Sequence, residues 1–265
     1  TNRHEVVNLS LEEGLSGIVD WYWFTEEGGI VGAFWGYKSL GLITTQEQID
    51  NNPTRPGAQI GNSYLWEDAN GDGEINGDDK TIIGNPYADY TLNFTSRFAY
   101  KGFDASVIVQ SVQNFDVFWN AGRDRFLDQT LWANHTNDYA NNSYQSPENP
   151  GIYPQPFRSN QPDDEFYRDS DLNLFDGSFV RIKNITVGYT LPKSATDKIG
   201  VDKIRFYASS NNPFTFTNYP GYDPEASNHS SESDSRPNGI TPRPGRDLDT
   251  YPTTKNFTLG VNLNF

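Results

Sequence analysis

The stretch that decides the fold is YTLNFTSRFAYKGFDASVIVQSVQ, residues 90 to 113. Apolar and aromatic residues recur at every second position in its first part, at Tyr90, Leu92, Phe94, Phe98 and Tyr100. After Lys101 and Gly102 the alternation resumes, at Phe103, Ala105, Val107 and Val109. Successive side chains of a strand point to opposite faces of a sheet. The stretch therefore predicts a β-hairpin with a very tight turn and one apolar face.

The length and chemistry of this hairpin favour a membrane over a soluble sheet. Ten residue steps of about 3.3 Å, tilted by roughly 40°, rise about 25 Å, which is the height of the apolar band of an outer-membrane barrel. Strands of soluble sheets are usually only about 5 to 6 residues long. The apolar row of the first strand carries no charge and has Tyr90 and Tyr100 at its ends, as expected for two aromatic girdles.

The closing residues, NFTLGVNLNF, repeat the pattern. Small or polar residues hold one parity and apolar residues hold the other, at Phe257, Leu259, Val261, Leu263 and Phe265. We interpret the apolar set as the terminal signal for barrel assembly, carried by the last strand of an outer-membrane barrel. A half-buried strand of a soluble sandwich has the same pattern, and these residues alone do not separate the two.

A second long hairpin is predicted around a turn at residues 192 to 200. Apolar residues alternate before this turn, and again after it up to about residue 209. The alternation changes parity after Ile182, which predicts a β-bulge near Lys183 and Asn184.

Loop lengths predict which side each connection faces. If Phe265 lies on the periplasmic side, both hairpin turns lie there too. The irregular stretches 114–177 and 212–255 are then long extracellular loops. Short turns on one side and long loops on the other are typical of outer-membrane barrels.

The composition excludes several classes of protein. The chain has 265 residues, 35% of them hydrophobic, with a net charge of −15 and no cysteine. Disulfide frameworks and thiolate chemistry are therefore excluded. The negative charge argues against nucleic acid as a partner, because phosphates repel it. No apolar run approaches the 18 or so residues of a transmembrane helix, whereas 15 Tyr, 17 Phe and 6 Trp favour many strands.

Two groups of aromatic residues allow two interpretations each. The stretch from Trp21 to Tyr37 would supply either interfacial anchors or the corner of a core. Aromatic residues of the long loops would either stack on a sugar or hold the loop together, and the second is favoured for Trp119, Trp132, Tyr139 and Tyr153. A short helix is expected over Thr45 to Asn51, because Thr45 and Gln48 have the spacing of a capping box.

The stretch DANGDGEINGDD has the spacing of a calcium loop. Oxygen-bearing side chains occupy loop positions 1, 3 and 5, a glycine occupies position 6, and position 7 offers a backbone carbonyl. The candidate ligands are Asp68, Asn70, Asp72, Glu74 and Asp79. Position 12 is Asp79 rather than the usual Glu, which resembles dockerin-type loops. We expect a structural Ca²⁺ here, and the alternative is a turn rich in Asx and Gly that only connects strands.

Catalysis has little support in the sequence. His4, His135 and His229 stand far apart, and there is no nucleophile elbow, HExxH motif or phosphate loop. We therefore predict that the chain is not an enzyme.

Six stretches together resemble a known family in its own order along the chain. They are GYKSLGLITTQEQID, DANGDGEINGDDKTIIGNP, FAYKGFDASVIVQ, DGSFVRIKNITVGYTLPKS, KIGVDKIRFYASSNNPFTFTNYPGYDPE and YPTTKNFTLGVNLNF. The resemblance is to the C-terminal barrel region of SusC/RagA-like TonB-linked outer-membrane transporters of Bacteroidetes. It covers nearly the whole chain from about Gly28 onwards.

The resemblance implies an all-β fold, the C-terminal portion of a transmembrane antiparallel β-barrel with long extracellular loops. At about one hairpin per 25 to 40 residues, residues 1–265 would supply roughly 8 to 10 strands of a larger barrel. The plug and the N-terminal strands are not found in this sequence, and an open barrel would leave unpaired edges in lipid. We therefore expect an N-terminal portion, on the same chain or a separate one, to close the barrel.

The resemblance also implies a function, partners and a location. The family imports oligosaccharides or peptides across the outer membrane, with a SusD-like surface lipoprotein as a lid and TonB as the source of energy. TonB would act through the missing N-terminal portion. One alternative is a structural subunit of a larger outer-membrane assembly that no longer transports. The other is a secreted, calcium-stabilised β-sandwich that binds carbohydrate.

Overall fold

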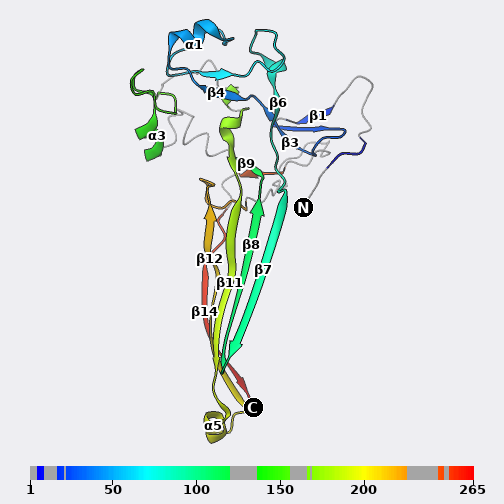
Figure 1. Ribbon diagram of the computed structural model, residues 1–265, viewed down its shortest axis with the longest axis vertical. Helices are drawn as coiled ribbons and strands as arrows, with labels where there is room; N and C mark the ends of the chain where they lie inside the picture. The colour runs from blue at the N-terminus through cyan, green and yellow to red at the C-terminus, as the bar shows by residue number, and fades with distance from the viewer. Residues whose placement is uncertain are drawn as a thin grey trace.

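The structure is a computed structural model that describes residues 5–8, 17–20, 22–119, 136–155, 166–167, 169–225, 244–247 and 251–265. These residues form an elongated molecule with two distinct parts (Figure 1). Long strands lie side by side along one part, and short strands and helices gather at one end of them. No helix among the described residues is long and apolar enough to cross a membrane.

The long strands form one antiparallel sheet, which we call the wall. Its strand order is β14-β12-β11-β8-β7. The strands are β7 (Tyr90–Tyr100), β8 (Phe103–Gln113), β11 (Phe179–Thr190), β12 (Lys203–Thr217) and β14 (Asn256–Asn264). Both predicted long hairpins are thereby confirmed, as is the predicted final strand. The strands have 9 to 15 residues, well above the usual length in soluble sheets.

The turn between β7 and β8 depends on two residues with positive φ. Lys101 has φ +46° and Gly102 has φ +86°, the backbone that two-residue hairpin loops require. A Cβ atom on Gly102 would lie only 2.7 Å from the carbonyl oxygen of Thr190 on the neighbouring strand. Glycine is therefore needed here for both conformation and space.

The predicted β-bulge is confirmed at the expected place. The pairing of β11 with both of its neighbours shifts between Ile182 and Asn184, so that Lys183 has no partner residue. On β12 the irregularity spans Asn212 and Pro213, after which Phe214 pairs with Ile182. This irregularity corrects one expectation. The long loop begins after Thr217 and not at 212, because the change of parity hides the continuation of the strand.

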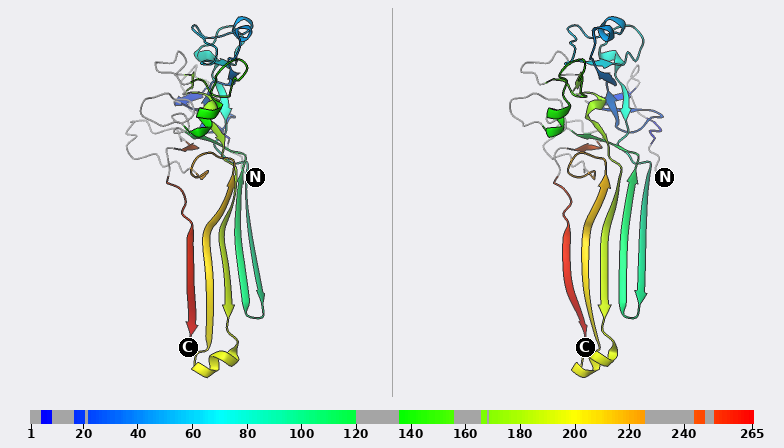
Figure 2. Two further views of the ribbon diagram at one scale, coloured as in Figure 1. Left: turned by 90° about the vertical axis from the view of Figure 1, so that its left-hand side faces the viewer. Right: turned by 60° about the vertical axis from the view of Figure 1, so that its left-hand side comes forward.

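The two hairpin turns and the C-terminus lie at the same end of the wall (Figures 1 and 2). The second turn holds α5 (Lys193–Thr196) and η3 (Asp197–Ile199). The connections between β8 and β11 and between β12 and β14 leave from the opposite end. Short connections at one end and long ones at the other agree with the predicted sidedness.

The wall has five strands among the described residues, fewer than the eight to ten expected. The estimate assumed that the whole chain builds hairpins of the wall, but much of it folds into small sheets beyond the end of β7 and β8. One contains β1 (Gly17–Asp20), β2 (Trp23–Glu26), β3 (Ala33–Gly36) and β6 (Thr81–Gly84). The others pair β4 (Ser39–Leu42) with β5 (Tyr64–Trp66), and β9 (Asp116–Trp119) with β10 (Leu174–Asp176) and β13 (Arg246–Asp247).

Short helices complete this part, which we call the loop region. They are α1 (Gln46–Asn51), η1 (Gly77–Asp79), α3 (Asn137–Asn142) and η2 (Asp171–Asn173). The helix expected after Thr45 is confirmed. The Thr45 hydroxyl accepts a hydrogen bond from the backbone N–H of Gln48, whose side chain in turn accepts from the Thr45 backbone.

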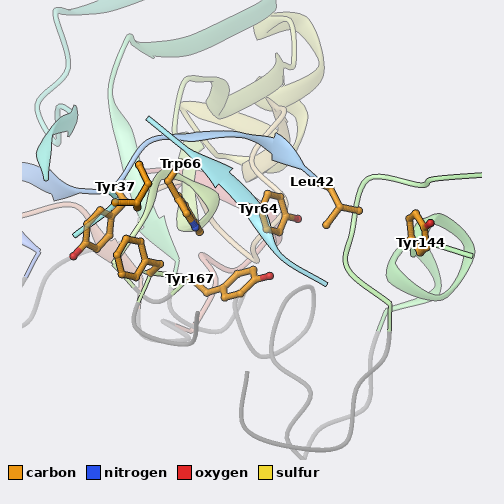
Figure 3. Packing of buried hydrophobic residues seen from close by; sticks show 8 residues of the cluster. Tyr37, Leu42, Tyr64, Trp66, Tyr144 and Tyr167 are labelled. Carbon is orange, nitrogen blue, oxygen red and sulfur yellow. The ribbon is translucent and has the colours of Figure 1, made fainter. Parts of the chain in front are cut away.

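The clusters of buried hydrophobic residues lie in the loop region and not in the wall. The largest cluster is aromatic and joins segments far apart in the chain (Figure 3). Tyr37 stacks on Phe166 with ring centroids 3.8 Å apart, and Trp66 meets Tyr167 edge-on at 6.0 Å. Stacked and edge-on pairs of this kind stabilise a core beyond the area they bury.

The structure decides between the interpretations of both aromatic groups where it describes them. Trp23, Phe34 and Tyr37 are buried, so the stretch from 22 to 37 forms a core corner and not a set of interfacial anchors. Trp119 and Tyr139 are buried as well, which confirms that loop aromatics hold the region together. Trp21 and Trp132 lie outside the described residues.

Candidate functional site

One face of the wall is apolar across all five strands. The register aligns its side chains into rows that cross the sheet from β7 to β14. One such row contains Tyr100, Phe103, Tyr189, Phe206 and Val261, each paired with the next. None of these residues carries a charge. Because the register aligns the apolar positions of neighbouring strands, the strands together form one mainly apolar surface.

This apolar face is exposed. Its large side chains include Leu92, Phe94, Phe98, Val187, Phe214 and Phe216, all of which remain open to the surroundings. No second sheet covers the face in the described part of the chain. Because soluble monomers rarely expose apolar patches larger than a few hundred Å², the arrangement opposes a β-sandwich, in which this face would be the core.

The five apolar residues of the C-terminal strand extend the same face. Phe257, Leu259, Val261 and Leu263 lie in β14, and Phe265 follows its last residue with 84% of its surface exposed. The residues that the sequence grouped are therefore brought together on one surface. Their role as a signal for barrel assembly stays a prediction.

The opposite face of the wall is polar and internally hydrogen-bonded. The Asn184 amide donates to Ser209 Oγ and to Asn211 Oδ1, at 3.1 and 2.8 Å. Nearer the turns, the Arg205 guanidinium donates to both carboxylate oxygens of Asp104, at 2.9 and 2.5 Å. A Cβ atom at Gly188 would lie 2.5 Å from Nη2 of Arg205, so a larger residue there would displace the Arg205 side chain.

A buried ionic cluster joins this polar face to the loop region. Arg181, on β11, is only 2% exposed, and its Nη2 donates to Asp223 Oδ1 at 2.5 Å. Its Nη1 donates to Glu225 and to the Thr253 hydroxyl, and its Nε donates to Thr215 Oγ1 at 2.9 Å. We call Arg181, Asp223, Glu225 and Thr253 the latch, because they tie the segments after β12 and before β14 to the wall.

The latch holds the Asp223 carboxylate in its charged form. Burial alone would raise the pKa of Asp223, but hydrogen bonds from Thr253 and Arg181 outweigh burial and lower it below the ordinary value. This cluster was not predicted from the sequence. The available signal was an arginine on the polar parity of a wall strand together with the acidic DPE that follows β12.

The candidate calcium residues lie in one loop, which their own side chains organise. Asp68 accepts hydrogen bonds from the backbone N–H groups of Gly71 and Gly73, at 2.7 and 2.8 Å. Asp79 is 1% exposed and accepts from the N–H groups of Ala69 and Asn76, at 3.0 and 2.8 Å. The carboxylates thus close the loop through backbone donors, as in Asx turns.

The remaining candidates, Asn70, Asp72 and Glu74, are exposed in the same loop. Among the described residues no three acidic or histidine side chains are grouped closely enough to hold a metal ion. Calcium binding therefore stays a prediction for this loop. The three histidines, His4, His135 and His229, lie outside the described residues.

Comparison with known proteins identifies the relatives of the chain. No family model matches it. TonB-dependent receptor P3 of Formosa agariphila is 33% identical over 90% of this chain, and TonB-dependent receptor SusC of Bacteroides thetaiotaomicron is 31% identical over 87%. The chain is homologous to SusC-type TonB-dependent receptors. It spans 22% of the length of the first relative and 20% of the second.

Solved structures confirm the fold of the chain. The RagAB peptide transporter covers 96% of the chain with a TM-score of 0.71 and 19% identity, and the chain covers 25% of it. The RagAB peptide importer in its closed-closed state gives a TM-score of 0.69. The wall is thus part of an antiparallel transmembrane β-barrel, which the five described strands do not close. The relatives are named as receptors and the solved neighbour as an importer, which agrees with the prediction that the chain is not an enzyme.

Proposed function

We propose that the chain is the C-terminal barrel region of a transporter that imports oligosaccharides or peptides across the outer membrane. The observation that carries the proposal is the exposed, uncharged and mainly apolar face that extends over all five strands of the wall. Such a face is stable in lipid and not in water. The polar face opposite would line the interior of the barrel.

The edges of the wall support further barrel strands elsewhere. β7 and β14 each pair with one neighbour in the described sheet, so each leaves one edge of backbone donors and acceptors open. Open edges do not persist in the hydrocarbon of a membrane. Further strands would close the barrel around a plug, and energy coupling to TonB would act through that N-terminal portion.

The loop region would then face the outside of the cell. It lies at the end of the wall opposite Phe265 and contains the aromatic cores (Figure 2). A folded region of this size, with its own core, offers a rigid surface for a SusD-like surface lipoprotein. The loop region would also shape the outer vestibule of the transporter.

The proposal is tested by uptake and by co-purification. A strain lacking the receptor should lose growth on its oligosaccharide or peptide source, and the intact gene should restore growth. The receptor should fractionate with the outer membrane and co-purify with a surface lipoprotein. Restored co-purification without restored growth on any such source would favour the alternative, a structural subunit that no longer transports.

A structural Ca²⁺ in the loop from Asp68 to Asp79 is a second proposal. It is supported by the ligand spacing and by the exposure of Asn70, Asp72 and Glu74 on one short loop. The ion would add to a loop that the carboxylates of Asp68 and Asp79 already close.

A further inference from the structure

A cavity of about 580 Å³ lies in the loop region, away from the wall. Its sides come from β4, from Tyr64 on β5, from residues 150 to 153 and from residues 171 to 175. Small-molecule sites usually have volumes of about 300 to 1,000 Å³. The cavity is thus large enough for a ligand of two or three residues or sugar rings.

Six of the thirteen residues that line the cavity are apolar, and five of these are aliphatic. The apolar lining residues are Leu40, Leu42, Pro150, Ile152, Leu172 and Phe175. Leu40 and Ile152 remain 57% and 61% exposed, so they present apolar surface at an open site. Figure 3 shows Leu42 beside Tyr64, where the cavity meets the aromatic core. Such a lining favours an aliphatic group over a polyol.

Asp171 supplies the negative charge in this lining. Its Oδ1 accepts a hydrogen bond from the Ser39 backbone N–H at 3.0 Å, and no ion pair with Asp171 occurs among the described residues. Lys38, next to Ser39, pairs instead with Glu67 at 3.2 Å. Burial raises the pKa of the Asp171 carboxyl, although the Ser39 hydrogen bond and the charge of Lys38 act in the opposite direction. A cation bound at this carboxylate would stabilise its charged form, which burial destabilises.

Both tyrosine hydroxyls of the lining are already engaged. Tyr64 donates its hydroxyl to the carbonyl oxygen of Ile152 at 3.2 Å, and Tyr153 donates its hydroxyl to Asp138 at 2.7 Å. A sugar depends on several donors and acceptors around its ring, whereas a protonated amine needs acceptors only. The polar groups of the cavity therefore suit an amine better.

We propose that this cavity binds the protonated amine of a small amphipathic ligand, with the amine on the Asp171 carboxylate and an aliphatic side chain against Leu40 and Ile152. A short peptide with an apolar first residue has this chemistry. The role of the cavity in uptake rests on the proposed function, but binding can be measured without transport.

The test uses the purified full-length receptor and two probes that differ only in the amine. Leucyl-glycinamide carries the cation, and its N-acetylated form does not; maltotriose is the hydroxyl-rich probe. Calorimetric titration should show the free amine binding about tenfold or more tightly than the acetylated form, as expected for a buried charge-assisted contact. Leu40→Ser should weaken both amide probes alike.

The variant Asp171→Asn keeps an acceptor for the Ser39 N–H but removes the charge. It should abolish the preference for the free amine, while Asp50→Asn on α1, outside the cavity, should preserve it. Equal affinity for both amide probes, an unchanged preference in Asp171→Asn, or binding of maltotriose alone would each overturn the proposal. If the purified receptor shows this binding pattern but does not support uptake, only the proposed function is contradicted. If the receptor supports uptake but lacks this binding pattern, only the proposal for the cavity is contradicted.

Discussion

Arg181 Nη2 lies 2.5 Å from Asp223 Oδ1 in a site where both side chains are almost fully buried. The two residues belong to different parts of the molecule, since Arg181 lies on the wall and Asp223 follows β12 in the loop region. Removing one member of a buried pair leaves an uncompensated charge and costs more than removing both. The latch therefore controls how firmly the two ends of the connection between β12 and β14 are held against the wall.

The first prediction concerns this pair. Asp223→Asn should destabilise the attachment of the β12–β14 connection to the wall by about 3 kcal/mol. This is the lower end of the range for a broken buried ion pair, because Glu225 still contacts Arg181. Hydrogen exchange at the amides of Glu225 and Thr253, which donate to Asp223, should accelerate accordingly. The exposed Asp202→Asn should leave both rates unchanged. Unchanged exchange in Asp223→Asn would show that the latch is not holding these segments.

The second prediction is the pH dependence of the latch. The pKa of Asp223 is lower in the folded state than the ordinary value of about 3.9. A lowered acid pKa stabilises the folded state above the unfolded pKa, and that stability is lost as pH falls through the folded pKa. Protection at Glu225 and Thr253, corrected for the intrinsic exchange rate, should hold at pH 5 and decline below about pH 4. If the protection of these two amides declined as pH rises, the predicted direction of the pH dependence would be contradicted.

The third prediction concerns calcium. If the loop from Asp68 to Asp79 binds Ca²⁺, a concentration of about 100 times the Kd should stabilise it by about 2.7 kcal/mol, and a chelator should reverse the effect. Asp72→Asn should weaken the response without unfolding the loop, because Asp68 and Asp79 still close it. Asp50→Asn is the control outside the loop. If millimolar Ca²⁺ does not change the midpoint of thermal unfolding, the calcium prediction is wrong and the loop is only a connecting turn.

The fourth prediction compares two neighbouring positions of β14. Leu259 lies on the apolar face and Thr258 on the polar face, opposite Ser209. Leu259→Arg should destabilise the folded barrel by about 2 to 4 kcal/mol if it lies near the middle of the membrane, and Thr258→Arg by much less. The fraction of receptor that resists unfolding by detergent on a gel measures the difference. Equal losses at both positions would remove the distinction between the faces.

The wall could be predicted from the sequence because its signal is local. Alternation along β7 and β8 is visible over 24 residues, from Tyr90 to Gln113, without knowledge of any partner strand. The bulge at Lys183 was visible for the same reason, as a change of parity. The end of β12 was not, because the irregularity at Asn212 and Pro213 interrupts the alternation and makes Phe214 and Phe216 look like loop residues.

The loop region and the latch could not be predicted, because their contacts join distant segments. Tyr37 stacks on Phe166, and Arg181 reaches Thr253, across stretches with no regular period. Alternation places Arg181 on the polar face but names no partner for it. The role of Asp171 could not be predicted either, because the cavity that it lines forms only when β4 and the segment after Ser170 pack together.

The most direct test of the central claim is a cysteine scan along β7 in the receptor's own membrane. The chain contains no cysteine, so single substitutions from Leu92 to Phe98 can each carry a fluorescent label, provided that the rest of the receptor is made cysteine-free. Quenching by lipids brominated in their acyl chains should be strong at Leu92, Phe94, Ser96 and Phe98 and weak at the positions between them. Quenching without this alternation, or none at any position, would contradict a membrane-spanning wall.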